Sequence, residues 1–237
     1  MAYLARAVNE QWQQPLHWYN PGRMQAAGSY LDSGRSPKNF TTGSATLTLT
    51  NGGWGCSFNG TSEYLAASSV ADWFFMQTGP FTMGGVVYTG TIQPGTWGGA
   101  GTAGVFGLAW GSTGTDLAIQ TTSGTLLYRC GASGCNVAGK QVVVFRVAPP
   151  TRTSVSPSTG FDTGAAYVNG LRVGHRAAGT WTAGAVNPAI PFQVGKNLST
   201  NAFVAGGFLD LFVDDREWGE DEIQAYTNYW KWKLDQI

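Results

Sequence analysis

The chain has 237 residues, of which 43% are hydrophobic and only 12% charged, with fourteen basic and fourteen acidic residues that cancel to a net charge of zero. Nucleic acid is bound through clustered Lys and Arg, whereas the basic residues here are scattered, so we exclude a nucleic-acid partner. No run of about eighteen apolar residues occurs, so we expect no membrane span. The length suits one large domain better than two small ones.

Residues 1–30 differ from the rest of the chain. They contain several aromatic residues, including Trp12 and Trp18, but no strand pattern until their end. Such a segment frays unless a surface holds it, so we predict an N-terminal arm over residues 1–30 that contacts other proteins of an assembly. The first twenty residues lack the apolar core of a signal peptide, so we expect a cytoplasmic protein or one released by lysis.

Period-two patterns dominate the chain after residue 31. The strictest is the Thr–Leu alternation over residues 45–50, followed by residues 54–58 and a turn at Asn59–Gly60. Asn169–Gly170 is the strongest hairpin signal, because both residues tolerate positive φ. Further strands are predicted at 81–88, 104–110, 116–120, 125–129, 141–147, 165–168, 171–175, 192–194 and 208–213. These short strands with glycine-rich turns predict an all-β fold of two packed antiparallel sheets.

One helix is predicted, at residues 220–234. Its apolar side chains lie on one helical face and comprise Ile223, Tyr226, Trp230 and Leu234. Acidic residues fill the first turn and lysines the last, as the helix dipole favours. We expect this face to pack on the sandwich, with binding to a partner protein as the alternative.

The three cysteines fall into two settings. Cys130 and Cys135 flank a short loop and form either a disulfide or two reduced thiols at a hairpin tip. Cys56 alternates with Trp54 and Phe58, which predicts a buried thiol. None of the spacings is typical of a zinc site.

Several segments follow one another in the order of a known family. They are the loop at 32–39 (DSGRSPKN), FNGTSEYL at 58–65, FTMGGV at 81–86, YVNG at 167–170 and GFLDLFV at 207–213 with WGEDEI at 218–223. In these segments the chain resembles the concanavalin A-like and laminin-G-like domains of bacterial surface and phage proteins. The resemblance implies a jelly-roll sandwich of two antiparallel sheets over residues 31–237, with the helix included.

The resemblance also implies a structural calcium ion. In the family, an Asp of the early loop and an Asp of a late strand share the ion, and these positions correspond to Asp32 and Asp210, with Asn39 as a third ligand. Asp210 alternates with Phe208 and Phe212, so we expect it to share their face and to need a metal, an arginine or backbone N–H groups. The alternative is a salt bridge from Arg35 or Lys38, which lie in the early loop.

Carbohydrate binding and hydrolysis leave different signatures. Trp97 and Trp181 lie in glycine- and threonine-rich contexts and are our candidates for loop residues that stack on sugars, with burial in the fold as the alternative. A glycanase of this fold needs paired acids on one strand, and the acids before residue 200 are isolated. The chain has two histidines, and no serine lies in a nucleophile-elbow motif. We therefore predict a protein that is not an enzyme.

We predict a structural protein of a bacteriophage virion, a capsid decoration or fibre-like protein. It would attach to other virion proteins through its arm, occur as a homo-oligomer or in many copies, and contact host-surface glycans through the sandwich. The alternative is a free bacterial carbohydrate-binding or adhesion module, located on the cell surface or in the cytoplasm. A polysaccharide-degrading glycanase is a third, weaker interpretation.

Overall fold

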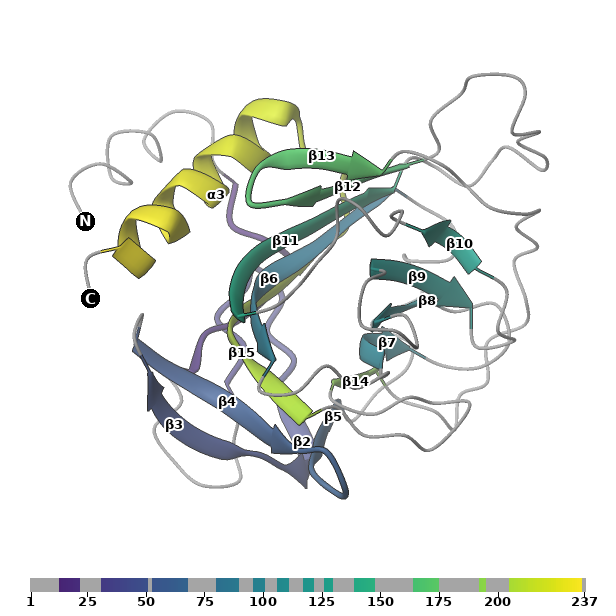
Figure 1. Cartoon of the computed structure of the whole chain (residues 1–237). Coiled ribbons are helices and arrows are strands. Elements are labelled where there is room, and N and C mark those ends of the chain that lie inside the picture. The colour runs from purple at the N-terminus through teal and green to yellow at the C-terminus, as the bar shows by residue number, and fades with distance from the viewer. Residues whose placement is uncertain are drawn as a thin grey trace.

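The structure is a computed structural model and describes twelve stretches of the chain (Figure 1). They are residues 13–21, 31–50, 53–67, 80–89, 96–100, 106–110, 117–121, 126–129, 139–147, 164–174, 192–194 and 205–235. Within them the chain forms two antiparallel sheets and one helix, in the arrangement of a jelly-roll-like sandwich. The predicted fold class is confirmed.

The larger sheet has eight strands among the described residues. Seven lie in the order β13 (Leu171–Gly174), β12 (Gly164–Val168), β11 (Gly139–Val147), β6 (Phe81–Thr89), β15 (Ala205–Asp214), β4 (Gly53–Asn59) and β3 (Thr46–Thr50). The eighth, β1 (His17–Tyr19), pairs with the second half of β15. The first half of β15 pairs with β4, and β6 pairs with the other side of β15. Strand β1 therefore lies beside the second half of β15 on the same side that β4 occupies beside the first half.

The second sheet has seven strands within the described stretches. Their order is β10 (Leu126–Arg129), β9 (Leu117–Thr121), β8 (Phe106–Trp110), β7 (Thr96–Ala100), β14 (Phe192–Val194), β5 (Tyr64–Ala67) and β2 (Phe40–Ser44). The chain crosses from the larger sheet to this one after β4, at Asn59–Gly60, where Gly60 has a φ of 76°. The Asn59 side-chain oxygen accepts hydrogen bonds from three backbone N–H groups of the turn, at 2.9–3.1 Å.

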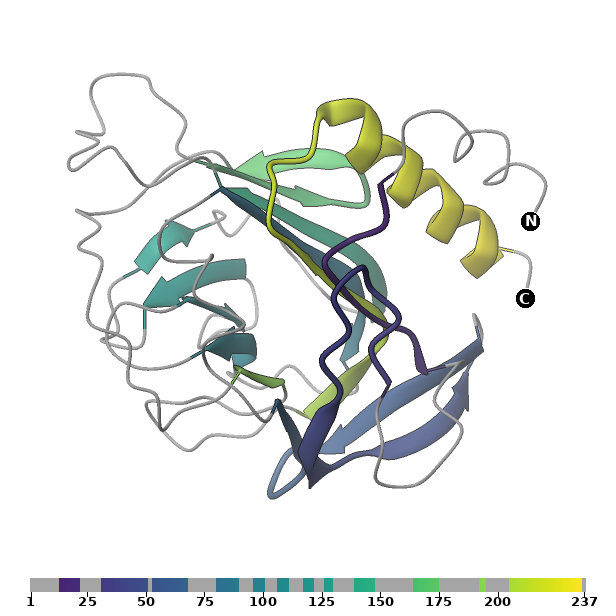
Figure 2. The same cartoon turned by 180° about the vertical axis from the view of Figure 1, so that it is seen from behind.

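The predicted helix is confirmed as α3 (Glu220–Asp235). Glu222 closes its first turn by accepting the Gly219 N–H at 2.9 Å, in the manner of a capping box. Its predicted apolar face is buried against the larger sheet at Ile223, Tyr226 and Trp230, with Leu234 partly buried beside them. The helix and the second sheet lie on opposite sides of the larger sheet (Figures 1 and 2). No helix of the described residues has the length and apolar character of a membrane span.

The predicted hairpin joins β12 to β13 and also anchors the helix. Asn169 and Gly170 have φ values of 52° and 82°, as a tight two-residue turn requires. The Asn169 side chain accepts the Val142 N–H at 3.0 Å, which ties the turn to β11. Gln224 of α3 donates to the Gly170 carbonyl at 2.6 Å, and a Cβ at Gly170 would lie 2.9 Å from Gln224 Oε1. The turn is therefore a docking point for α3.

Residues 17–19 lie inside the segment predicted as an arm, yet they form a strand of the larger sheet. His17 and Tyr19 are buried at 1% and 0% exposure. Three residues are too few to show a period-two pattern, so β1 could not be identified from its sequence. The role of residues 1–30 in assembly stays a prediction, because residues 1–12 and 22–30 lie outside the described part of the chain.

Candidate functional site

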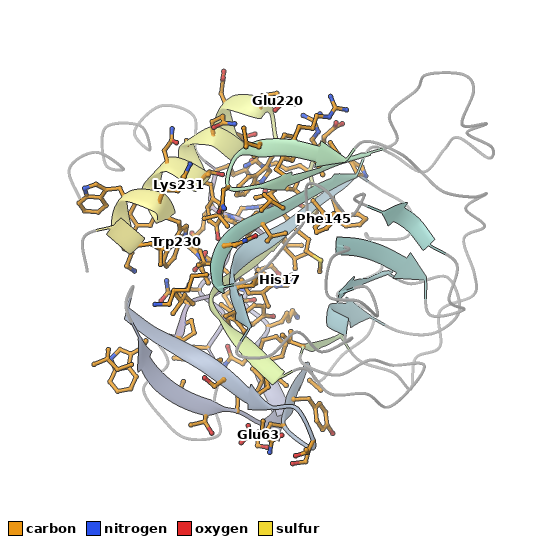
Figure 3. The ribbon with its side chains drawn as sticks, in the orientation of Figure 1. His17, Glu63, Phe145, Glu220, Trp230 and Lys231 are labelled. Atoms are coloured by element: carbon orange, nitrogen blue, oxygen red, sulfur yellow. The ribbon has the colours of Figure 1, made fainter. Side chains whose placement is uncertain are left out.

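Three buried carboxylates tie β1, the loop after it, β15 and α3 together, and the first is Asp32. Its Oδ1 accepts the backbone N–H groups of Trp18 and Gly34, each at 2.7 Å. Its Oδ2 accepts the Lys38 N–H at 2.8 Å and lies 2.7 Å from His17 Nδ1. Because an ionised carboxylate only accepts, the proton of this ring nitrogen points at Asp32. Figure 3 places His17 in the interior of the molecule.

Asp210, in the middle of β15, is the second buried carboxylate, with 0% exposure. Its Oδ1 accepts from Trp18 Nε1 at 2.7 Å and from the Asn20 side-chain amide at 3.2 Å. Its Oδ2 accepts from the Tyr226 hydroxyl of α3 at 2.6 Å. Trp18 therefore connects the two carboxylates, with its backbone on Asp32 and its indole on Asp210.

Burial changes the proton affinity of the Asp210 cluster. Loss of hydration raises the pKa of Asp210 to about 6, and its three hydrogen-bond donors and the nearby Lys233 reduce this rise. The same burial raises the pKa of Tyr226 well above its usual value and lowers the pKa of Lys233. The ring of Trp230 lies 4.3 Å from the Lys233 ammonium. The three groups that bond Asp210 are all neutral donors.

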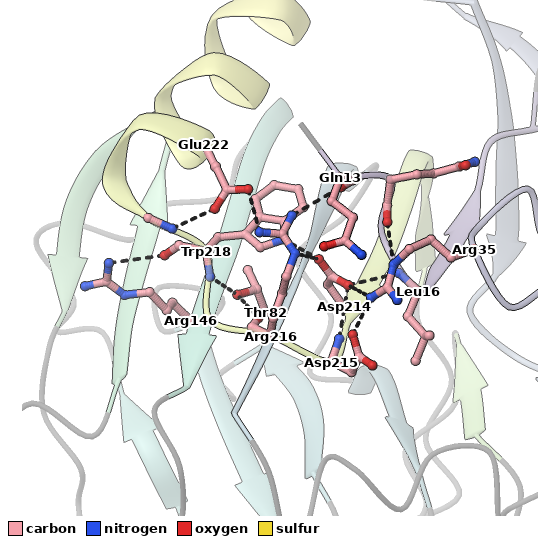
Figure 4. Close-up of polar contacts among 12 residues, drawn as sticks. Gln13, Leu16, Arg35, Thr82, Arg146, Asp214, Asp215, Arg216, Trp218 and Glu222 are labelled. Atoms are coloured by element: carbon pink, nitrogen blue, oxygen red, sulfur yellow. Dashed lines mark hydrogen bonds and ion pairs between the residues drawn. The ribbon is translucent and has the colours of Figure 1, made fainter. Parts of the chain in front are cut away.

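Asp214, at the end of β15, is surrounded by charged partners (Figure 4). Its Oδ1 accepts from Arg35 at 2.8 Å and from the Leu16 N–H at 3.0 Å. Its Oδ2 accepts from Trp218 Nε1 at 2.6 Å and lies 2.9 Å from Arg216 Nε. Arg216 also pairs with Glu222 of α3 at 2.6 Å, so the ion pairs link the loop after β1, through Arg35, to the helix.

The predicted calcium ligands do not fit a shared ion in this arrangement. Asn39 lies beside Asp32, but its side-chain oxygen accepts the Asp32 N–H at 2.9 Å. The oxygens of Asp32 and Asp210 face N–H and O–H donors, which a cation would have to displace. Among the described residues, no three His, Cys, Asp or Glu side chains gather as a metal-ligand group. Calcium binding is thus implied by the resemblance alone, and the contacts of Asp32, Asn39 and Asp210 argue against it.

The predicted face of Asp210 is confirmed for Phe212, since both contact Tyr226 of α3, and wrong for Phe208. A β-bulge shifts the pairing of β15 with β6 between Phe208 and Asp210, so strict alternation does not extend across Leu209. Phe212 packs in the core under α3, stacked on Trp218 with ring centres 4.2 Å apart. The ring of Phe208 lies instead 6.2 Å from that of Phe58.

The early loop supplies a salt bridge, as the alternative to calcium predicted, but to a carboxylate that the sequence did not indicate. Arg35 pairs with Asp214 and Asp215, whereas Lys38 contributes its backbone N–H to Asp32. Sequence reasoning missed His17, Trp18 and Asp214. The only available signal was the high aromatic content of residues 12–19, which we assigned to an external partner.

The predicted sugar-stacking residues have different outcomes. Trp97 was expected in a loop, but it lies in strand β7, between β8 and β14. Glycine-rich residues favour loops, yet Gly99 pairs with both β8 and β14 and holds this segment extended, with Trp97 at a register shift in the pairing with β8. Trp181, Cys130 and Cys135 lie outside the described residues. The predicted buried thiol is confirmed, since Cys56 is free and has 0% exposure, and burial raises its pKa.

The chain matches no protein-family model and no curated protein sequence. Several solved structures do match it. Domain 4 of AbnA, a GH43 extracellular arabinanase from Geobacillus stearothermophilus in complex with arabinotriose, is 12% identical with a TM-score of 0.61, over 90% of this chain and 98% of that one. Trypanosoma rangeli sialidase in complex with sialic acid is 17% identical with a TM-score of 0.60, over 89% of this chain and 32% of that one.

The binding domain of Paraclostridial Mosquitocidal Protein 1 is also similar, with 9% identity and a TM-score of 0.62, over 92% of this chain and 52% of that one. These matches agree with the jelly-roll-like β-sandwich of two antiparallel sheets. At these identities the likeness concerns the fold alone. The sandwich spans about a third of the sialidase chain but nearly all of the arabinanase domain.

Proposed function

We propose that this sandwich is a carbohydrate-binding module without catalytic activity of its own. The observation that carries the proposal is its correspondence to domain 4 of AbnA, which is in complex with arabinotriose. The match covers 98% of that domain, against 32% of the sialidase chain. In extent, the sandwich therefore resembles a separate sugar-holding domain rather than a whole glycoside hydrolase.

The state of the buried acids supports binding over catalysis. Hydrolysis of a glycosidic bond needs two carboxyl groups that face the sugar. Asp32, Asp210 and Asp214 are at most 7% exposed. Their oxygens accept hydrogen bonds from groups of the chain itself, which favours a structural role for them. Recognition is then left to aromatic stacking and to amide or hydroxyl groups at the surface.

Trp97 and Trp181 are the residues that we propose to stack on the sugar. Trp97 belongs to β7, where it lies at a register shift in the pairing with β8, and Gly99 beyond it pairs with strands on both sides in the second sheet. That sheet lies on the side of the molecule away from α3 (Figure 1). A ligand there leaves the carboxylate network under α3 undisturbed.

The test is calorimetric titration of the purified chain with arabinotriose, together with a screen on an immobilised glycan panel. Trp97→Ala and Trp181→Ala are expected to weaken binding to any glycan found by at least about tenfold, the loss of about 1.4 kcal/mol. Trp232→Ala is the matched control, because Trp232 is 53% exposed on α3. The proposal would be overturned if the chain bound none of the glycans at millimolar concentration, or if it released reducing ends from a polysaccharide.

The setting that we propose for this module is the surface of a phage particle, where residues 1–12, which precede β1 in the predicted arm, contact other virion proteins. The low charge and the aromatic residues of that segment support this setting. Because β1 belongs to the sheet, a deletion that tests it must remove residues 1–12 and keep His17–Tyr19. The deleted chain should stay folded and no longer sediment with particles, and retained sedimentation contradicts the proposed contact.

A further inference from the structure

The open edges of the two sheets are not alike. Unpaired edge strands invite pairing with other chains, and proteins protect them with charges, bulges and irregular backbone. Strand β13 carries Arg172 and a register shift against β12, and β10 carries Arg129 and a register shift against β9. Strand β2 has a shift after Phe40 and a left-handed Gly43 with a φ of 99°. The outer side of β1 is covered, since Ser33 donates to the Trp18 carbonyl at 2.8 Å.

Strand β3 has none of these protections. Its sequence, Thr-Leu-Thr-Leu-Thr, contains no charge, no proline and no glycine. All its residues pair with β4 in one continuous register, from Thr46 opposite Ser57 to Thr50 opposite Gly53. Among the described strands, β4 is the only one that pairs with it. Figures 1 and 2 show β3 at the outer margin of the molecule. A regular, neutral edge of this kind is suited to accept another strand.

The exposed apolar side chains next to this edge point to a protein partner. Leu49 is 66% exposed and pairs directly with Trp54 of β4, which is 49% exposed. Closer to the core, Leu47 is half-buried and pairs with the fully buried Cys56. One face of the β3–β4 hairpin is therefore apolar from the core outward, and its outer part meets solvent.

We propose that β3 pairs antiparallel with β3 of a second copy of this chain, so that the larger sheet continues across a two-fold axis. When the two strands overlap fully, Thr48 lies opposite itself and Leu47 lies opposite Leu49 of the partner subunit. A two-fold contact requires each surface to be complementary to itself, and an uncharged strand with this alternation meets that requirement. The pairing brings Leu49 and Trp54 of both copies to one apolar seam.

The nearest described acid on this edge does not oppose the pairing. Thr46 donates to Glu63 at 3.2 Å, at the start of β3 (Figure 3). Antiparallel overlap places Thr46 opposite Thr50 of the partner subunit, so the two Glu63 side chains lie at opposite ends of the seam. A second copy thus satisfies the backbone groups of β3 and the apolar surface beside it without bringing like charges together.

The first test compares two matched substitutions by analytical ultracentrifugation at tens of micromolar chain. Leu49→Lys places a charge in the seam, whereas Leu171→Lys makes the same change on β13, where Leu171 is 72% exposed. Both residues are exposed, so both variants are expected to fold. The unmodified chain and Leu171→Lys should sediment as dimers, and Leu49→Lys as a monomer. A monomeric unmodified chain, or a dimer that persists in Leu49→Lys, would overturn the proposal.

The second test reads the register. Under mild oxidation, Thr48→Cys is expected to form a disulfide-linked dimer, because the two-fold axis brings residue 48 next to its own copy. Thr46→Cys should not, since residue 46 lies opposite residue 50. The unmodified chain, with its three native cysteines, gives the background. Equal cross-linking in both variants contradicts this register and the pairing that rests on it.

Discussion

The middle and the end of strand β15 each bury an aspartate, and they neutralise its charge in different ways. At the end, Asp214 faces Arg35 and Arg216, at 2.8 Å and 2.9 Å. In the middle, Asp210 has only neutral donors within hydrogen-bonding distance, an indole, an amide and a phenol. Both aspartates have 0% exposure.

The difference separates two uses of a buried carboxylate. The Asp214 cluster joins charged groups from three parts of the chain, so loss of its acid leaves Arg35 with Asp215 alone and Arg216 with Glu222 alone. In the Asp210 cluster, burial of the negative charge costs free energy. The hydrogen bonds that Asp210 accepts from Trp18 and Tyr226 connect β1 to α3. We therefore expect the stability contributed by the Asp214 cluster to change mainly on mutation, and that contributed by the Asp210 cluster to change also with pH.

The largest effect is expected from Asp214→Ala. The substitution removes a fully buried carboxylate and is expected to cost about 3–5 kcal/mol of unfolding free energy. This cost is expected because the Trp218 indole N–H and the Leu16 N–H lose their acceptor, at about 1–3 kcal/mol each, and two ion pairs are lost as well. Urea denaturation followed by tryptophan fluorescence measures this loss. Asp215→Ala is the matched control, since Asp215 also pairs with Arg35 but is 37% exposed, and it should cost less than about 1 kcal/mol. Equal losses of unfolding free energy in the two variants would show that the burial of Asp214 does not make it more important than Asp215.

A smaller effect is expected at Asp210, and it depends on pH. The pKa of about 6 in the folded chain lies above the ordinary value of 3.8, so the folded state binds more protons than the unfolded state between these values. Stability contributed by this group therefore rises as pH falls from 7 to 4, by at most about 3 kcal/mol.

Asp210→Asn isolates this contribution, because its amide oxygen still accepts from Trp18 and its N–H₂ can donate to the Tyr226 hydroxyl. We expect the difference in unfolding free energy between the unmodified chain and Asp210→Asn to change by about 1–3 kcal/mol between pH 7 and pH 4. Denaturation curves at both pH values measure this change. A difference that does not vary with pH contradicts the role given to burial.

The smallest effect is expected from calcium. Around each of the buried acids Asp32, Asp210 and Asp214, N–H and O–H donors occupy the directions in which a cation would bind. A chelator and millimolar calcium should therefore leave the melting temperature of the chain unchanged. A specific ion would instead stabilise the folded chain by about 2.7 kcal/mol at one hundred times its dissociation constant, which calorimetry detects readily.

Elements whose signals are local could be predicted from the residue pattern alone. The Thr–Leu alternation predicted β3, Asn169–Gly170 predicted the β12–β13 turn, and the apolar spacing of residues 220–234 predicted α3 and its buried face. In each case the deciding interactions lie within a few residues, so the period of the pattern is sufficient. The all-β class followed from the number of such segments.

Contacts between residues far apart in the chain could not be predicted in this way. Strand β1 owes its place to β15, and the Leu16 N–H reaches an aspartate 198 residues away. Trp97 lies in a strand because β8 and β14 both pair with Gly99, two residues after it. Asp32 and Asp210 were predicted as metal ligands, but the donors around them come from other elements. Such contacts depend on how the sheets and the helix pack, and no periodicity along the chain records them.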